Sequence, residues 1–382
     1  MHFHTTRHAD QPLTGPLMLG HFLPWYTIRG DAFPLHPDDA ATLRSEPPRL
    51  EDMRHWNDSR AGYRRTHLHM PEIGVYDSRD PAVIEWQIRV ALDHGVSGFI
   101  LNWYGMYSAE NVITLHWLRG LEHWNRANPE RPFAYCFSYD MQAQWPTEGK
   151  RPVSLEEDFV YIRDHLVRDA YLHRSGRPIF TVFPYGDERM AYREVLDRVF
   201  APTGADLIWS GAPQAGGEDA GYAWVKPDAD TVRPDQPCCW SDPDNCGIRE
   251  LQHWYDASQT CPEGTAYLMH GVWPEFNNTL VAWAWSKDPT HPHIRPSVIC
   301  RETRGGNSLD RTWQVYLDYL KRRRAGDPRT HVPAPLVQLV TWNDYAETTT
   351  LEPSREYGNS PLARCRDYLR RARELYEGPG PG

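Results

Sequence analysis

The chain has 382 residues, of which 40% are hydrophobic and 24% are charged, a composition that supports a sizeable core and excludes global disorder. Its formal net charge of −10 argues against a nucleic-acid partner, because binding a phosphate backbone relies on basic residues that release counterions. We expect no membrane partner and a cytoplasmic location, or a secreted one after removal of a leader, since neither a membrane-length apolar run nor a signal segment stands out.

Short apolar runs alternate with segments of helical periodicity along the whole chain. The predicted strands cover residues 17–23, 96–103, 133–139, 179–183, 206–209, 222–225, 266–272 and 336–342. The predicted helices cover residues 81–94, 110–125, 155–171, 187–200, 248–258, 309–324 and 361–376. The first of these helices has clear end signals, because Asp80 can cap it, Pro81 suits its first position and Gly95 follows its end.

This alternation is typical of parallel β/α units, and it predicts the α/β fold class with one (β/α)8 TIM barrel. A doubly wound sheet is the competing fold, but no G-x-G-x-x-G motif follows the first strand. We expect an N-terminal extension over residues 1–16, the barrel domain over 17–376 and a flexible tail over 377–382. Long insertions at 24–79 and 273–307 follow the first and seventh strands, so both should lie on the C-terminal face, where barrels carry active sites.

The strongest chemical signal lies directly after the last predicted strand, where Asn343, Asp344 and Glu347 follow an apolar run. Side chains three residues apart on one turn have Cβ atoms about 5–6 Å apart. Glycosidic hydrolysis needs two carboxyl groups, one protonated and one ionised, and repulsion within a close pair would raise one pKa. The same residues would also suit a solvated acidic loop, and the pattern by itself leaves both interpretations open.

Resemblance to two families favours the catalytic interpretation. Residues 342–347, Trp-Asn-Asp-Tyr-Ala-Glu, resemble the Trp-Asn-Asp-Tyr-Gly-Glu stretch of glycoside hydrolase family 71, and residues 347–353 resemble the Glu-Gly-Thr-Gln-Ile-Glu-Pro stretch of glycoside hydrolase family 99. Further similar segments cover residues 20–26, 71–81, 95–104 and 137–141. Both families are (β/α)8 barrels that hydrolyse α-glucan or α-mannan. The resemblance therefore implies an endo-acting glycosidase with Asp344 as the first carboxylate and Glu347 as the acid that protonates the leaving oxygen.

The chain departs from family 99 around the acids. That family has Glu where this chain has Asp344, His where it has Ala346 and Gly where it has Thr348. Family 99 retains configuration through an anhydrosugar, with its first acid acting on the sugar 2-hydroxyl, whereas family 71 inverts with a carboxylate that activates water. Carboxyl groups about 6.5–9.5 Å apart would favour inversion, and about 5–5.5 Å a direct nucleophile. Sugar, linkage and stereochemistry stay open.

Aromatic and polar residues at predicted strand ends and in the first insertion are the candidates for substrate contact, because an aromatic face beside polar groups suits a sugar. They are Trp25, Tyr26, Glu72, Asn102, Trp103, Tyr104, Asp140 and Asn343. Each aromatic residue would equally suit loop packing. The alternative for Asp140 is a helix or turn cap, and the alternative for Glu72 is an exposed ion pair with Arg79.

No metal or organic cofactor is expected. The histidine pairs have no third ligand at a fixed spacing, and the cysteine cluster has no paired C-x-x-C motif. These clusters are His67 with His69, His291 with His293, and Cys238, Cys239, Cys246 and Cys261, for which reduced thiols or a local disulfide are the alternatives. The expected partner is an oligosaccharide or polysaccharide substrate. Two other functions stay open: a transferase or processing enzyme of polysaccharide biosynthesis, and a glycan-binding protein without turnover.

Overall fold

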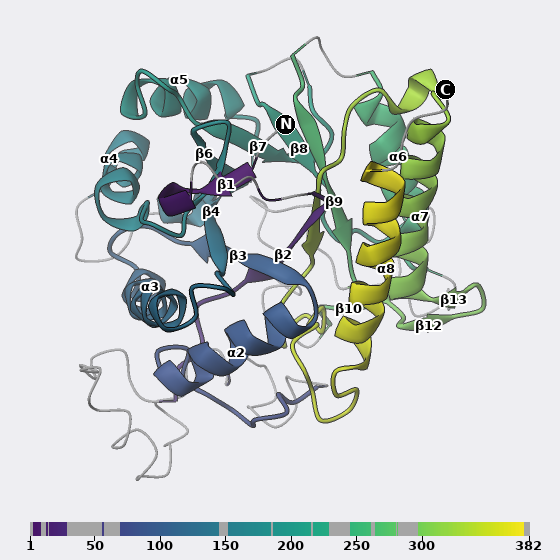
Figure 1. Cartoon of the computed structure of the whole chain (residues 1–382), viewed down its shortest axis with the longest axis horizontal. Helices are drawn as coiled ribbons and strands as arrows, with labels where there is room; N and C mark the ends of the chain where they lie inside the picture. Colours follow the sequence, from purple (N-terminus) through teal and green to yellow (C-terminus); the bar gives the residue numbers. More distant parts are fainter. Residues whose placement is uncertain are drawn as a thin grey trace.

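The computed structural model describes residues 3–8, 13, 15–28, 56, 69–144, 152–184, 186–214, 217–228, 245–260, 264–279, 281 and 297–377. Parallel strands close into a barrel, since the sheet order runs β6-β4-β3-β2-β14-β9-β8-β7 and β6 also pairs with β7. These strands are β2 (Leu17–Phe22), β3 (Val96–Trp103), β4 (Ala134–Asp140), β6 (Arg177–Phe183), β7 (Asp206–Ser210), β8 (Ala220–Tyr222), β9 (Tyr267–Val272) and β14 (Leu336–Leu339). The predicted (β/α)8 barrel is confirmed (Figure 1).

Helices cover the outside of the barrel (Figure 1). They are α2 (Pro81–Asp93), α3 (Ala109–Ala127), α4 (Leu155–Tyr161) with the π-turn η6 (Ile162–Leu166), α5 (Arg189–Val199), α6 (Ile248–Ser258), α7 (Ser308–Arg324) and α8 (Ser360–Glu377). The cap predicted for α2 forms, because the Asp80 side chain accepts a hydrogen bond from the backbone N–H of Ala82. Within the described ranges no helix has both the length and the apolar character needed to cross a membrane.

Shorter elements extend this frame. Strand β1 (Phe3–Thr5) pairs antiparallel with β5 (Leu172–Arg174), which pairs in turn with β6. The others are η1 (Thr6–His8), η5 (Met141–Gln144), β10 (Phe276–Asn277), β11 (Val298–Ile299), β12 (Glu302–Thr303), β13 (Gly306–Asn307) and η9 (Pro328–Thr330). The expected domain limits stay a prediction, and the expected tail beyond Glu377 lies outside the described residues.

One difference from the predicted elements bears on the site. Strand β14 ends at Leu339, three residues before the predicted end at Trp342. The N–H of Thr341 donates to the C=O of Thr349 in the following loop, whereas the N–H of Trp342 donates to the C=O of His21 on β2. The chain therefore leaves the sheet early but stays bonded to the neighbouring strand, which anchors the loop that follows.

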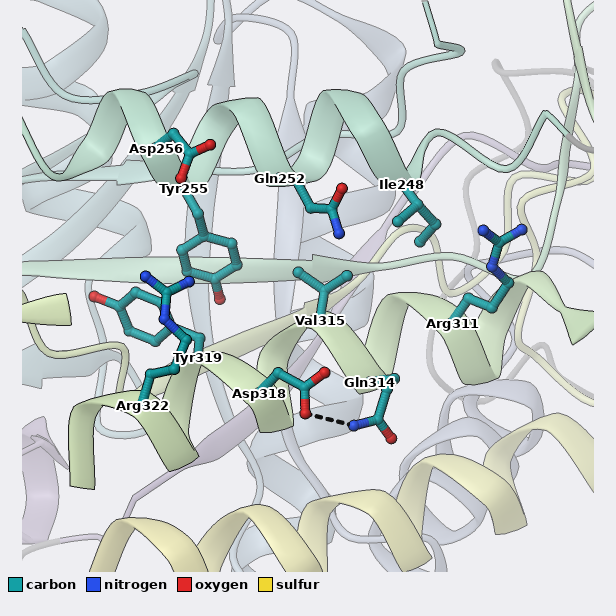
Figure 2. Close-up of a pocket in the computed structure, with 10 residues that line it drawn as sticks. All are labelled: Ile248, Gln252, Tyr255, Asp256, Arg311, Gln314, Val315, Asp318, Tyr319 and Arg322. Carbon is teal, nitrogen blue, oxygen red and sulfur yellow. Dashed lines mark hydrogen bonds between the residues drawn. The ribbon is translucent and has the colours of Figure 1, made fainter. Parts of the chain in front are cut away.

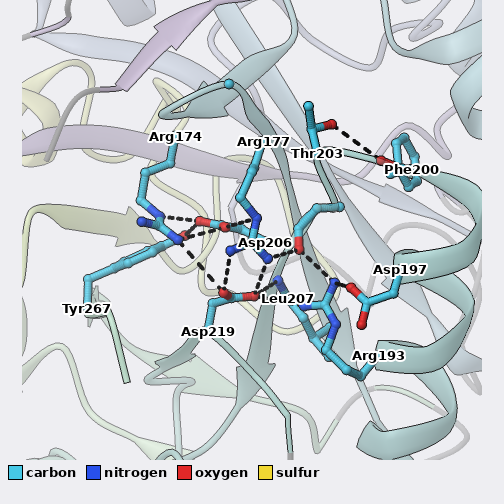
Figure 3. A network of polar contacts seen from close by, with 12 residues as sticks. Arg174, Arg177, Arg193, Asp197, Phe200, Thr203, Asp206, Leu207, Asp219 and Tyr267 are labelled. Carbon is cyan, nitrogen blue, oxygen red and sulfur yellow. Dashed lines mark hydrogen bonds and ion pairs between the residues drawn. The ribbon is translucent and has the colours of Figure 1, made fainter. Parts of the chain in front are cut away.

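A network of ion pairs joins strands at the N-terminal end of the barrel (Figure 3). The side chain of Asp206, the first residue of β7, is fully buried and accepts hydrogen bonds from Arg174 (2.8 Å) and from the hydroxyl of Tyr267 (3.1 Å). Arg177 pairs with Asp206 at 3.2 Å and with Asp219 at 3.0 Å. Polar groups at this end of a barrel serve stability, because the chemistry occurs at the other end.

Asp206→Asn is expected to destabilise the protein by about 3–5 kcal/mol, because removing one partner of a buried ion pair leaves the other charges uncompensated. Urea unfolding followed by circular dichroism measures the loss. Asp318→Asn is the matched control, since Asp318 pairs with Lys321 on an exposed part of α7 and such pairs contribute little. Equal effects of the two substitutions would contradict the role given to Asp206.

Candidate active site

Both predicted acids lie at the C-terminal end of the barrel, on the loop that follows β14. We call residues 340–352 the acid loop. The backbone N–H of Asp344 donates to the hydroxyl of Thr341 (2.8 Å), and the Asp344 carboxylate accepts from the backbone N–H of Glu347 (3.0 Å). Asp344 is 5% exposed and Glu347 is half-buried. These bonds close one tight turn, which brings the two carboxyl groups together.

The two carboxyl groups interact directly. Burial raises the pKa of Glu347 well above its ordinary value, and the charge of Asp344 and a hydrogen bond to the Asp344 side chain raise it further. A raised pKa keeps a carboxyl group protonated to higher pH than an ordinary glutamate, which is the property that a general acid needs. Which stereochemical route the pair follows stays a prediction.

Thr348, directly after Glu347, has an unusual backbone conformation. Its φ is +61°, in the left-handed region that β-branched residues rarely adopt, and Gly occupies this position in family 99. Such strain persists only where the surrounding contacts over-determine the backbone. One such contact is the C=O of Glu347, which accepts from the N–H of Asn277 on β10 (2.8 Å). Both backbone groups of Glu347 are thus hydrogen-bonded, its N–H to the Asp344 carboxylate and its C=O to the N–H of Asn277.

Glu352 centres a hydrogen-bond cluster that supports this loop. It is 2% exposed, and its carboxylate accepts from the side chains of Tyr76 (3.0 Å), Gln87 (2.6 Å), Trp342 (3.0 Å) and Tyr345 (2.7 Å). Burial raises the pKa of Glu352 to about 7, although four donors favour the ionised form. The cluster joins the first insertion, α2 and the acid loop. Glu352 was not among the predicted site residues, and the Glu-Pro step that closes the loop was the available signal.

Asn343 and Tyr26 were predicted to contact substrate, but the structure shows both side chains buried, and they support the acid loop. Asn343 is fully buried, and its amide accepts from the N–H of Leu23 (2.8 Å) and donates to the C=O of Leu23 (3.1 Å). Tyr26 is also fully buried and stacks on Trp56, with ring centroids 4.1 Å apart. The Tyr26 hydroxyl accepts from the N–H of Tyr345 (3.1 Å). Both side chains therefore position the loop and leave no exposed surface for a ligand.

Asn102 and Asp140, two predicted contact residues, meet at the C-terminal ends of β3 and β4. The amide of Asn102 donates to the Asp140 carboxylate (3.3 Å), and its oxygen lies 3.3 Å from Nε2 of His21 on β2. Burial raises the pKa of Asp140 to about 7 and lowers that of His21 to about 4, so His21 is neutral at neutral pH. His21 was not predicted, although a histidine inside an apolar strand was a usable signal.

Three aromatic candidates, Trp25, Trp103 and Tyr104, lie near the ends of β2 and β3, and they have different environments. Trp25 and Tyr104 are half-buried and nearly parallel, with ring centroids 6.4 Å apart and 17° between their planes. Trp103 is fully buried, and its indole N–H donates to Asn111 on α3 (3.0 Å). Side chains alternate along a strand, so Trp103 faces the helices while Asn102 faces the barrel. The predicted substrate contact of Trp103 is wrong, and the residue belongs to the core.

Glu72 lies on an exposed turn and does not pair with Arg79 as the alternative interpretation expected. Arg79 instead forms a buried ion pair with Asp77 (2.8 Å). The backbone N–H of Glu72 donates to the C=O of Pro353 (2.8 Å). The turn therefore packs against the segment that follows the acid loop, and the predicted contact of Glu72 with substrate stays a prediction.

The part of the chain that the structure describes contains no group of three or more His, Cys, Asp or Glu side chains suited to a metal ion. Cys246 is a buried free thiol, and His69 lies 2.8 Å from Glu275. The other members of the histidine and cysteine clusters lie outside the described residues: His67, His291, His293, Cys238, Cys239 and Cys261.

A cavity of about 400 Å³ lies between α6 and α7 (Figure 2). Side chains of these two outer helices line it, among them Gln252, Gln314 and Asp318, and neither Asp344 nor Glu347 contributes. Barrel enzymes place their reacting groups at the C-terminal ends of the strands, not between outer helices. The acid loop is therefore the better candidate for the active site.

Comparison with known proteins gives a distant relative in sequence. No protein-family model matches the chain. An uncharacterized protein named WxcX from Xanthomonas campestris pv. campestris is 24% identical over 333 residues, and the protein of the same name from strain B100 aligns equally well. The alignment covers 80% of this chain and 44% of WxcX, so the chain spans less than half the length of these relatives.

Solved structures resemble the barrel more completely. A GH99 endo-alpha-mannosidase from Bacteroides thetaiotaomicron superposes with a TM-score of 0.58 at 15% identity, covering 96% of this chain and 100% of that one. A structure described as a glycoside hydrolase-like protein has a TM-score of 0.54 at 15% identity, covering 79% and 89%. The predicted resemblance to a family 99 barrel is thereby confirmed, and at this identity the likeness establishes the fold.

Proposed function

We propose that the protein is a glycoside hydrolase that cleaves internal bonds of an α-linked glycan. The observation that carries the proposal is the tight turn that places Glu347 beside Asp344, whose carboxylate accepts from the backbone N–H of Glu347 (3.0 Å). Burial and the charge of Asp344 raise the pKa of Glu347, which favours a protonated Glu347 beside an ionised Asp344. General acid catalysis of glycosidic cleavage needs this division between two carboxyl groups. The place of the pair after the last barrel strand and the family 99-like fold support the same activity.

Glu347 is the general acid of this mechanism. It donates its proton to the glycosidic oxygen while the bond from that oxygen to the anomeric carbon breaks. Water adds to the anomeric carbon and loses a proton. In an inverting route water attacks as the glycosidic bond breaks, and Asp344 accepts the water's proton directly. In a route through an anhydrosugar, Asp344 first accepts the proton of the sugar 2-hydroxyl while its oxygen bonds to the anomeric carbon. The ionised Glu347 then accepts the proton of the attacking water, and Asp344 returns its proton to the 2-oxygen as the anhydrosugar opens.

Substrate binding in this proposal uses groups on the same face. The parallel rings of Trp25 and Tyr104 offer apolar surface to the C–H face of a sugar. Asp140, held by Asn102, offers a carboxyl group to sugar hydroxyls. Aromatic surface beside a few oriented polar groups is the composition that sugar-binding sites require.

The test is a panel of α-gluco- and α-manno-oligosaccharides, with the products followed by NMR. We expect cleavage of at least one series, and the anomer released first assigns the route. A retained first product would exclude direct activation of water by Asp344. Binding without cleavage across the panel would instead favour a glycan-binding protein without turnover.

Activity should decline at high pH as Glu347 loses its proton. Because the pKa of Glu347 is raised well above 4.5, the acid stays protonated into a range where an ordinary glutamate is ionised. The value of kcat/KM should fall as pH rises through the pKa of Glu347, since the ionised form has no proton to donate. The measurement is kcat/KM between pH 4 and 9. The same decline in the residual activity of Glu347→Gln would assign it to another group.

A further inference from the structure

Tyr357 is an exposed aromatic residue on the face that carries the acid loop. It lies between Glu352 and α8, and it is 38% exposed. The guanidinium of Arg301 lies 3.7 Å from the ring centroid, and the ring of His69 lies 5.1 Å away at 68° to it. An exposed ring in contact with two other side chains differs from a ring that projects freely into solvent, because its orientation is restricted.

One carboxylate fixes both neighbours of this ring. Oε1 of Glu275 accepts from Nε of Arg301 (2.9 Å) and lies 2.8 Å from Nε2 of His69. The side chains of Glu275, Arg301 and His69 are only 14%, 11% and 7% exposed. We call His69, Glu275, Arg301 and Tyr357 the Tyr357 platform. Its buried members orient a ring that itself remains accessible.

The platform lies beside the acid loop because one small hairpin contacts both. Phe276 on β10 pairs with Ile299 on β11, and Asn277 on β10 donates its N–H to the C=O of Glu347 (2.8 Å). Glu275 and Arg301 flank this hairpin, so they are two residues from Asn277 and Ile299. Two extended residues span about 7 Å. The platform is therefore close enough to contact a glycan that also reaches Glu347.

We propose that the Tyr357 platform is a distal subsite that binds a neutral sugar residue of the glycan, away from the bond that is cleaved. This inference rests on the proposed function. An aromatic ring binds the C–H face of a sugar, and Tyr and Arg are both well suited to hold a ligand that has apolar and polar surfaces. The charge of Arg301 is balanced by Glu275, so the platform favours a neutral sugar over an acidic one.

The experiment measures binding in a Glu347→Gln background, which prevents turnover. Isothermal titration calorimetry compares α-gluco- and α-manno-oligosaccharides of two and six residues. Tyr357→Ala should weaken binding of the hexasaccharide by about five- to twentyfold, the range expected for loss of one aromatic contact. Binding of the disaccharide should change by less than about twofold, because it does not span both places. Tyr357→Phe, which keeps the ring, should bind as the parent does.

Met190→Ala is the control, because Met190 is a 54% exposed apolar residue on α5, and it should change neither affinity. Equal hexasaccharide affinity in Tyr357→Ala and its parent would overturn the subsite and leave the proposed hydrolysis intact. A Tyr357-dependent affinity in a protein that cleaves no oligosaccharide would support the subsite and overturn the hydrolase. A parent that binds no member of either series would overturn both.

Discussion

Glu347→Gln is expected to lower kcat on natural α-glycans by about 10²–10⁴-fold, the contribution of a positioned general acid. Gln keeps the shape of the side chain but has no proton to donate to an alkoxide leaving group. The backbone bonds from Glu347 N–H to Asp344 and from Asn277 N–H to Glu347 are independent of the side chain. The variant should therefore unfold at nearly the temperature of the parent, which thermal denaturation checks.

The choice of substrate separates an acid from a residue that only shapes the site. An aryl glycoside with a good leaving group needs little protonation, so the defect of Glu347→Gln should shrink on it. Asp344→Asn should impair both substrates, because the proton that Asp344 accepts does not depend on the leaving group. Equal losses for Glu347→Gln on both substrates would show that Glu347 is not the acid.

Local pattern predicted most of the barrel because its strands and helices have strong periodicity. The strand expected at 96–103 is β3, and the helix expected at 248–258 is α6. The helix expected to reach residue 171 ends earlier, because the chain passes into a π-turn and the N–H of Val167 donates to the C=O of Ile162. A change of hydrogen-bond register leaves no mark on the apolar pattern, so the sequence did not indicate it.

The residues of the candidate site were predictable where they share one short segment, and were missed where their contacts are distant along the chain. Asp344 and Glu347 were predicted because they lie in one short segment that resembles the catalytic stretches of two families. Glu352 was missed because two of its donors, Tyr76 and Gln87, lie 276 and 265 residues away along the chain. The error at Trp103 was avoidable, since strand alternation forbids it from facing the same side as Asn102.

Glu352→Leu is expected to cost on the order of 4 kcal/mol of stability or more, because it leaves four buried donors without their acceptor at about 1–3 kcal/mol each. Turnover should fall as well, by up to about 10²-fold, since the donors Trp342 and Tyr345 flank Asp344 and small displacements of reacting groups are costly. Chemical unfolding and kcat measure the two effects. Glu356→Leu is the control, because Glu356 is exposed and, among the residues that the structure describes, accepts one backbone N–H, that of Met70, at 3.1 Å.

Glu352→Gln tests how the cluster holds its proton. Folding raises the pKa of Glu352 from 4.5 to about 7. The protonated side chain therefore adds about 3 kcal/mol to the free energy of unfolding below pH 4.5, and this stabilisation is lost as the pH rises through 7. Gln mimics the protonated form and does not titrate. The variant should therefore approach the parent in stability near pH 5 and equal or exceed it at pH 8. A variant that instead loses most stability at pH 8 would show that the four donors keep Glu352 ionised, so that the loop is held by a charge.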